Sequence, residues 1–291
     1  MTYSTVDVPV RRGSLRVGRW DAGSGTPTAF LAHGITANHV GFRPLAEALA
    51  ARRISVIAPD LRGRGRSNTL PEPYSMQAHA DDAVATFDAL GLSGPVVAVG
   101  HSMGGFVVLA LAASAGKRLQ SVLLLDGGPR LAVPANIDTD ATLHAVIGPA
   151  MARLEMTFPS PEAYLDFWRP HPAVSTAWGP AVEEYLLYDL VGDAPEMRSS
   201  ASLDAVRADA TDTLVGDPPQ LVTGLPTAML RAERGMMNDE GGLYPIDSVQ
   251  PLCDEAGIPL QTIPDVNHYS MIWLPAGIDA IVATIQHNLR Q

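Results

Sequence analysis

The stretch VVAVGHSMGGFVVLALAA, from Val96 to Ala113, places a serine between two apolar runs of different kinds. The first run is short and rich in β-branched residues, which is typical of a buried strand, whereas the second has the length of a buried helix. Between them, Gly100 to Gly104 match the pattern G-x-S-x-G. Glycines on both sides permit a turn so sharp that side chains there would clash, and such a turn leaves the hydroxyl of Ser102 exposed. The segment therefore predicts a strand, a turn and a helix, with Ser102 as a nucleophile at the turn.

Short β-like runs alternate with helical patterns over most of the chain, which is typical of a mostly parallel sheet with helices on both faces. The predicted strands are Thr5–Val10, Leu15–Asp21, Thr28–Ala32, Ser55–Ala58, Val96–Val99, Val122–Leu125, Thr227–Arg231 and Leu260–Ile263. The predicted helices between them are Phe42–Ala51, Met76–Leu90, Met103–Ala115 and Ile278–Leu289. We therefore expect an α/β fold around an eight-stranded, mostly parallel sheet.

This alternation stops over residues 131–220, a segment rich in proline and aromatic residues, with helix-like pieces at Glu162–Trp168 and Ala181–Leu190. We expect an inserted helical cap over residues 131–220 and a sheet domain formed by residues 1–130 and 221–291. Some aromatic side chains of the cap should face the serine and close an apolar pocket for a small molecule. The predicted pocket residues are Gly34, His39, Phe158, Trp168, Trp178, Tyr188 and Met236.

A serine hydroxyl is a poor nucleophile until a base accepts its proton, so Ser102 requires a histidine elsewhere in the chain. Of the eight histidines, His268 in IPDVNHYSMI follows the last predicted strand and precedes the final helix. Catalytic side chains gather on loops at the end of such a sheet. His268 is therefore the predicted base.

The composition argues against several classes of function. The chain has 31 acidic and 20 basic residues, and the resulting net charge of −11 opposes binding to nucleic acid and to anionic membranes. A single cysteine, Cys253, allows no intrachain disulfide, and the first residues hold no apolar run of signal-peptide length, so we expect a cytoplasmic protein. No residue cluster has metal-ligand spacing and no motif calls for a cofactor. We expect a monomer or homodimer that acts on a small molecule and has no membrane span.

Four motifs in this order resemble those of the α/β-hydrolase family, especially its capped, single-domain esterases, lactonases and epoxide hydrolase-like members. They are FLAHGITANHVGF, VIAPDLRGRGRS, VGHSMGG and PDVNHYSM, and the resemblance covers nearly all of the chain. It implies the fold and the catalytic machinery but not the substrate. It implies a triad in which His268 accepts the proton of Ser102 and a carboxylate orients the imidazole. It also implies an oxyanion hole formed by the backbone N–H groups of Ile35 and Met103.

The acid of this triad stays open between several carboxylates. In relatives it usually lies in the turn after the strand that matches TAMLRAERGMMNDE, but Gly235 stands at that place. Asp126 ends the stretch SVLLLD, whose strand should lie next to the elbow strand, and some families of this fold use an acid there. The alternatives in the later turn are Glu233, Asp239 and Glu240. Asp126 is the predicted acid.

The sequence thus predicts a serine hydrolase that cleaves a carboxylic ester or lactone of a small, fairly hydrophobic substrate through an acyl-enzyme. A serine at position 102 disfavours dehalogenases and epoxide hydrolases, which use an aspartate at the elbow to form an alkyl-enzyme ester. Three alternatives remain: a C–C bond hydrolase, a cofactor-free dioxygenase of the same fold and a non-catalytic ligand-binding protein. Polar groups that grip the substrate, such as His39, would favour a dioxygenase, whereas Met103 beside the serine is more typical of a hydrolase.

Overall fold

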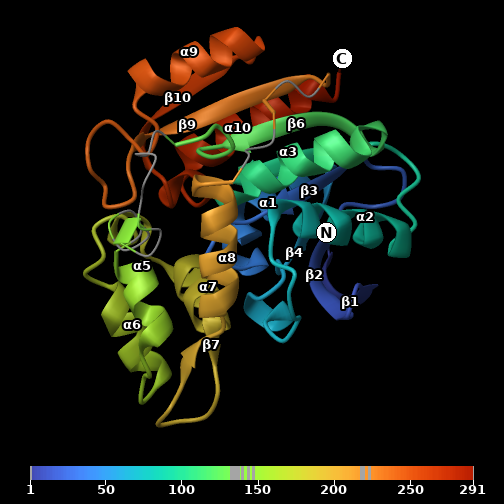
Figure 1. Ribbon diagram of the computed structural model, residues 1–291. Coiled ribbons are helices and arrows are strands. Elements are labelled where there is room, and N and C mark those ends of the chain that lie inside the picture. The colour runs from blue at the N-terminus through green and yellow to red at the C-terminus, as the bar shows by residue number, and fades with distance from the viewer. Residues whose placement is uncertain are drawn as a thin grey trace.

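One eight-stranded sheet organises the protein, with the strands in the order β1-β2-β4-β3-β5-β6-β9-β10 (Figure 1). This computed structural model describes residues 2–131, 138, 141–142, 145, 148–216, 220–221 and 224–290. The strands are β1 Thr2–Val10, β2 Gly13–Asp21, β3 Thr28–Ala32, β4 Ser55–Pro59, β5 Val96–His101, β6 Leu119–Leu125, β9 Thr227–Arg234 and β10 Leu260–Asn267. Strand β2 pairs antiparallel with β1 and β4, and the other neighbours pair in parallel. The predicted mostly parallel sheet is confirmed, strand by strand.

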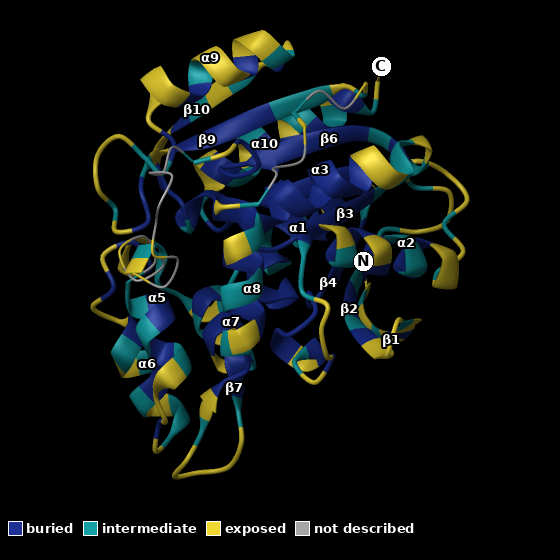
Figure 2. Cartoon of the chain, in the orientation of Figure 1, coloured by how far each residue is buried: buried dark blue, intermediate teal, exposed yellow. Residues whose placement is uncertain are grey.

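Helices cover both faces of this sheet. One face packs against α1 (Arg43–Ala51) and α10 (Pro275–Asn288), and the other against α2 (Met76–Ala89), α3 (Met103–Ala115) and α9 (Ile246–Ala256). Because alternate strand residues point to opposite faces, Val97 and Val99 join one core while Ala98 joins the other. Figure 2 shows β6 and most of α3 in the dark blue of buried residues. The sequence predicts these helices except α9. This helix contains Pro251, which interrupts the helical pattern, and it buries few of its residues.

A helical segment lies between β6 and β9, where the sequence predicts the cap. Its described elements are α5 (Pro149–Ala152), η4 (Arg153–Glu155), α6 (Pro161–Trp168), η5 (Ser175–Ala177), α7 (Pro180–Asp189), β7 (Leu190–Val191), β8 (Arg198–Ser199) and α8 (Leu203–Leu214). We call residues 148–214 the inserted helices. Residues 132–137, 139–140, 143–144, 146–147 and 217–219 of the predicted cap lie outside the described residues. The division into a sheet domain and a cap therefore stays a prediction.

The inserted helices have a polar core of their own around Asp189. This buried carboxylate accepts hydrogen bonds from Tyr164, Arg153, Ser199 and Ser200, so it ties η4, α6 and the β7–β8 hairpin together. A buried charge is tolerated only when it is paired and hydrogen-bonded in this way.

The remaining described elements are short 3-10 turns that shape the sheet's edges: η1 (His39–Phe42), η2 (Gly65–Ser67), η3 (Gly116–Arg118) and η6 (Ser270–Ile272). Among the helices that the structure describes, none is long and apolar enough to cross a membrane.

Candidate active site

Ser102 occupies a strained turn between β5 and α3. Its φ of 57° and ψ of −125° lie in a region that residues with a side chain rarely adopt, and its N–H donates to Leu125 O at 2.9 Å. The flanking glycines are required by close packing: a Cβ on Gly100 would lie 2.1 Å from Gly104 O, and one on Gly104 would lie 2.0 Å from Ala32 O. The predicted strand–turn–helix unit is therefore confirmed. Strain of this kind costs about 1–3 kcal/mol and persists where the surroundings enforce it.

His268 lies in the loop directly after β10, with its backbone N–H donating to Arg234 O at 3.1 Å. Its Nδ1 contacts Asp126 Oδ2 at 2.7 Å, and both side chains are buried. The other oxygen of Asp126 accepts from Ala232 N–H at 3.2 Å, which holds the carboxylate in place. Because an ionised carboxylate only accepts, Nδ1 carries the imidazole proton and Nε2 is left with a free lone pair. The imidazole is thus held in the tautomer that accepts a proton.

The alternative acids lie elsewhere. Glu233, near the end of β9, and Asp239 and Glu240, beyond it, are all exposed. Glu233 accepts from Asp265 N–H at 3.0 Å, and Asp239 accepts from Met237 N–H at 3.1 Å. Of the four candidate carboxylates, Asp126 is the one that contacts His268.

The loop after β3 packs directly onto the serine. A Cβ on Gly34 would lie 3.2 Å from Ser102 Cβ and 3.5 Å from its Oγ. Ile35 follows in a turn closed by Ala37 N–H, which donates to Gly34 O at 3.2 Å. Met103 is the first residue of α3, where a backbone N–H has no carbonyl partner within the helix. Both N–H groups thus belong to segments that adjoin Ser102, as an oxyanion hole would require.

Two pockets meet at Ser102 and share Ile35 and Met236 in their lining. They contain about 500 and 560 Å³ of empty space, part of it open to solvent. The first also has the aromatic lining residues Phe42, Tyr185, Tyr269 and Trp273, and the second the apolar lining residues Phe106, Leu131, Leu214 and Leu243. Among the described lining residues there is no Lys or Arg, and the one carboxylate, Asp126, contacts His268. Such a two-lobed, mostly apolar site suits a neutral molecule whose reacting centre lies between two substituents.

Comparison with known proteins agrees with this fold. A family model described as alpha/beta hydrolase fold matches residues 28–157, which hold β3 to β6 and the elbow. This part of the chain matches the family, and the whole chain has the α/β-hydrolase fold.

The α/β-hydrolase relatives differ in their named activities. Lipase LipV of Mycobacterium tuberculosis is 34% identical over 45% of this chain and 50% of its own length. The 2-(acetamidomethylene)succinate hydrolase of Mesorhizobium japonicum is 26% identical over 86% of this chain and 84% of its own length. A crystal structure of E-2-(acetamidomethylene)succinate hydrolase aligns with all of both chains at a TM-score of 0.78 and 21% identity. The matches to the first curated relatives span half of their length or less.

Five of the predicted pocket residues lie away from the two pockets of this α/β-hydrolase, and those predictions are corrected. Gly34 and Met236 do line a pocket, but the other five do not. Phe158 and Trp168 are buried among the inserted helices, because that segment needs an apolar core of its own. Trp178 donates its indole N–H to Glu183 at 2.8 Å and stacks under Arg169.

His39 and Tyr188 are the remaining two, and both contact Asp60. His39 Nδ1 donates to Asp60 Oδ1 at 2.7 Å and its Nε2 accepts from Tyr3 OH at 2.9 Å, while Tyr188 OH donates to Asp60 Oδ2 at 2.7 Å. Burial works to raise the pKa of Asp60, but His39 and the neighbouring N–H donors lower it to about 2. With both ring nitrogens occupied, His39 does not grip a substrate, so the feature that favoured a dioxygenase is removed.

Sequence reasoning missed the aromatic residues that do line the first pocket. Tyr269 and Trp273 belong to the segment just after His268, and Trp273 donates its indole N–H to Gly41 O at 3.0 Å. Their closeness in the chain to the predicted base is a signal that could have identified them.

Two buried histidines support the site without being candidates for the base. His101 Nε2 donates to His268 O at 2.8 Å, and the rings lie 4.7 Å apart. Burial, followed by repulsion from His268, lowers the pKa of His101 to about 3. Burial likewise lowers the pKa of His33 to about 3. Both are therefore neutral donors at ordinary pH that hold backbone in place.

Within the described residues, no group of three or more His, Cys, Asp or Glu side chains is arranged to hold a metal ion.

Proposed function

We propose that this protein is a serine hydrolase that cleaves a carboxylic ester or lactone of a small, neutral, fairly hydrophobic substrate through an acyl-enzyme. The observation that carries the proposal is the contact of 2.7 Å between His268 Nδ1 and Asp126, beside a strained elbow that presents Ser102 to the same pocket. A nucleophile, a base and a group that orients the base are the three parts that acyl transfer by serine needs.

The reaction follows from these positions. Ser102 Oγ attacks the carbonyl carbon while His268 Nε2 accepts its proton, and the N–H groups of Ile35 and Met103 stabilise the resulting oxyanion. Collapse of the tetrahedral intermediate breaks the bond to the leaving alkoxide, which takes the proton from His268. A water molecule then attacks the acyl-enzyme as His268 accepts its proton, and collapse of the second tetrahedral intermediate releases the acid by breaking its bond to Ser102 Oγ, which takes that proton back. In a lactone the leaving alcohol stays attached to the acyl group, so the product is one hydroxy acid.

The charge of the pocket lining supports a neutral substrate. A buried carboxylate or phosphate of a substrate needs a cationic or multiple hydrogen-bonding partner, because its desolvation costs several kcal/mol. Neither pocket has a Lys or Arg among its described lining residues. We therefore expect neutral esters to be preferred over substrates such as the succinate derivative named for the structural neighbour.

The test is a panel of neutral and anionic aryl esters, alkyl esters and lactones, assayed with the wild type and Ser102→Ala. We expect turnover of neutral acyl compounds and a loss of about 10³-fold or more in Ser102→Ala, with an unchanged unfolding temperature. A fluorophosphonate should label the wild type on Ser102, as read by peptide mass spectrometry. Retention of more than a few per cent of activity in Ser102→Ala would contradict the acyl-enzyme, and preference for a dicarboxylate would contradict the substrate class.

A further inference from the structure

Three successive carbonyls in the loop after β3 each accept a hydrogen bond from a different buried side chain. His33 Nδ1 donates to Gly34 O at 2.8 Å, Arg64 Nε donates to Ile35 O at 2.9 Å, and Arg153 Nη2 donates to Thr36 O at 2.7 Å. The donors come from the residue after β3, from the segment before η2 and from η4 of the inserted helices. We call residues 34–36 the carbonyl loop.

These bonds determine where the Ile35 N–H points. This N–H and the Gly34 carbonyl belong to one planar peptide unit, so a donor on the carbonyl fixes the direction of the N–H. It also polarises the unit, which makes the N–H a stronger donor. The next two peptide units are held by the two arginines, so the backbone on both sides of Ile35 has little freedom. A displacement of about 1 Å in such a group is enough to cost about 10²-fold in rate.

Arg153 connects the carbonyl loop to the core of the inserted helices. Its Nε donates to Tyr164 OH at 3.0 Å and to Asp189 at 3.2 Å, its Nη1 donates to Ala150 O, and its guanidinium lies 5.2 Å from the Trp168 ring. The side chain is 2% exposed. One arm of this buried guanidinium leaves the inserted helices and reaches the carbonyl loop.

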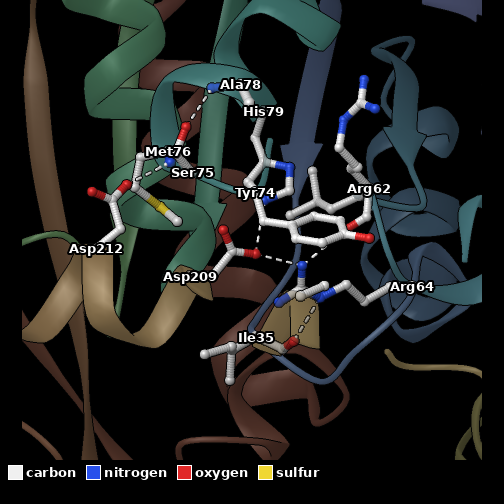
Figure 3. A network of polar contacts seen from close by, with 12 residues as sticks. Ile35, Arg62, Arg64, Tyr74, Ser75, Met76, Ala78, His79, Asp209 and Asp212 are labelled. Atoms are coloured by element: carbon white, nitrogen blue, oxygen red, sulfur yellow. Dashed lines mark hydrogen bonds and ion pairs between the residues drawn. The ribbon is translucent and has the colours of Figure 1, made fainter. Parts of the chain in front are cut away.

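Arg64 makes a second connection, from the sheet side, as Figure 3 shows. Its Nη1 forms an ion pair with Asp209 of α8, and His79 Nε2 of α2 lies 3.0 Å from the same carboxylate oxygen. All three side chains are fully buried. The arginine that holds Ile35 O is therefore itself held by an inserted helix.

We propose that Arg64 and Arg153 are positioning residues that make the oxyanion hole depend on how the inserted helices sit against the sheet. This inference rests on the proposed serine-hydrolase function. Loosening either arginine should weaken stabilisation of the transition state and leave substrate binding nearly unchanged, because neither arginine lines the pockets.

The test compares Arg64→Lys and Arg153→Lys with a matched control, Arg62→Lys. Lysine keeps the positive charge beside Asp209 or Asp189, but it lacks the fork that bonds an aspartate and a loop carbonyl together. Arg62 is a buried arginine of the same motif and pairs with Asp82 at 2.7 Å. Its other bonds go to Pro71 O and Arg11 O and not to the carbonyl loop.

The readouts are kcat, KM and the inhibition constant of an aryl boronic acid. Ser102 Oγ adds to boron as its proton passes to His268, and one boronate oxygen then takes the place of the oxyanion. We expect kcat to fall about 10- to 100-fold in Arg64→Lys and Arg153→Lys, boronate affinity to fall in parallel and KM to stay within about threefold. Arg62→Lys should change each value by less than about threefold, at a temperature where circular dichroism shows every variant folded.

Wild-type kcat and boronate affinity in both lysine variants, or losses that Arg62→Lys shares equally, would overturn the inference. If a lysine variant does not fold, it is replaced by a variant of the arginine's own partner, Asp209→Asn for Arg64 or Asp189→Asn for Arg153, because the amide keeps the shape of the carboxylate while weakening its hold on the arginine. This replacement should lower kcat and boronate affinity by smaller factors and leave KM nearly unchanged, and an unchanged kcat would overturn the inference. A wild type that neither turns over esters nor reacts with a fluorophosphonate would instead refute the proposed function, and this inference with it.

Discussion

Asp126 follows β6 with a φ of 45°, a conformation that few residues other than glycine adopt. In this conformation one carboxylate oxygen meets Ala232 N–H and the other meets His268. At the place where relatives usually carry the acid, a Cβ on Gly235 would lie 2.5 Å from the Asp239 carboxylate. In the turn after β9, Gly235 thus packs against Asp239, and the carboxylate that contacts His268 is Asp126.

Asp126→Asn should lower turnover by up to about 10⁴-fold, because an amide can donate to Nδ1 and so favour the wrong imidazole tautomer. The measurement is kcat/KM for a neutral aryl ester at constant pH, with the fold checked by circular dichroism. Glu233→Gln and Asp239→Asn are the matched controls, since both carboxylates are exposed, and each should stay near the wild-type rate. A near-normal rate for Asp126→Asn would rule out its role in the triad.

At the scale of elements, the elbow joins three strands. Gly104 of α3 packs on the end of β3, and a Cβ on Gly127, after β6, would lie 1.9 Å from Ser102 O. The first helical turn of α3 is therefore pressed between neighbouring strands, and this contact holds the strained φ of Ser102. The free energy gained by burying the apolar residues of α3, most of which are buried, offsets the cost of this strain.

Gly104→Ala should destabilise the protein by about 1–3 kcal/mol or more, since the added methyl group would overlap the β3 backbone 2.0 Å away. Gly94→Ala is the control, because nothing lies within 4 Å of a Cβ at that position. Urea unfolding of both variants measures the difference. Equal stabilities of the two variants would show that the elbow tolerates a wider turn than its packing indicates.

At the scale of the whole molecule, buried neutral histidines link stability to pH. The pKa of both His33 and His101 is lowered to about 3 from 6.5, by burial first. Asp60 acts on His33 in the opposite direction, whereas Arg64 and His79 reinforce the lowering. The unfolded chain therefore binds protons at these sites below about pH 6.5 while the folded chain does not, so stability is present above that pH and is lost as pH falls toward 3.

We expect the free energy of unfolding to fall by on the order of 1 kcal/mol per pH unit per histidine between about pH 6 and 4. Urea unfolding at several pH values and constant ionic strength measures this slope. In His101→Gln the amide can still donate to His268 O but does not titrate, so the slope should decrease by about one proton. An unchanged slope in this variant would show that His101 is not a source of the acid sensitivity.

The sequence alone determined the order of the eight strands of the sheet along the chain, the elbow at Ser102 and the position of His268. These features are local: hydrophobic periodicity reports which segments form strands or helices, and the glycines around Ser102 report a backbone shape that only nearby residues enforce. The same patterns could not choose among four carboxylates, because in the sequence every one of them follows the end of a predicted strand.

Only the tertiary structure decided the partner of His268, the lining of the pockets and the donors to the carbonyl loop. Asp126 and His268 are separated by 142 residues, and Thr36 and Arg153 by 117. Aromatic residues such as Phe158 and Trp168 are equally suited to roof a pocket or to fill a core, and periodicity reports burial but not the neighbour that causes it. Whether such a side chain lines a pocket or fills a core depends on how segments distant in sequence pack against each other, and that packing is a property of the assembled fold.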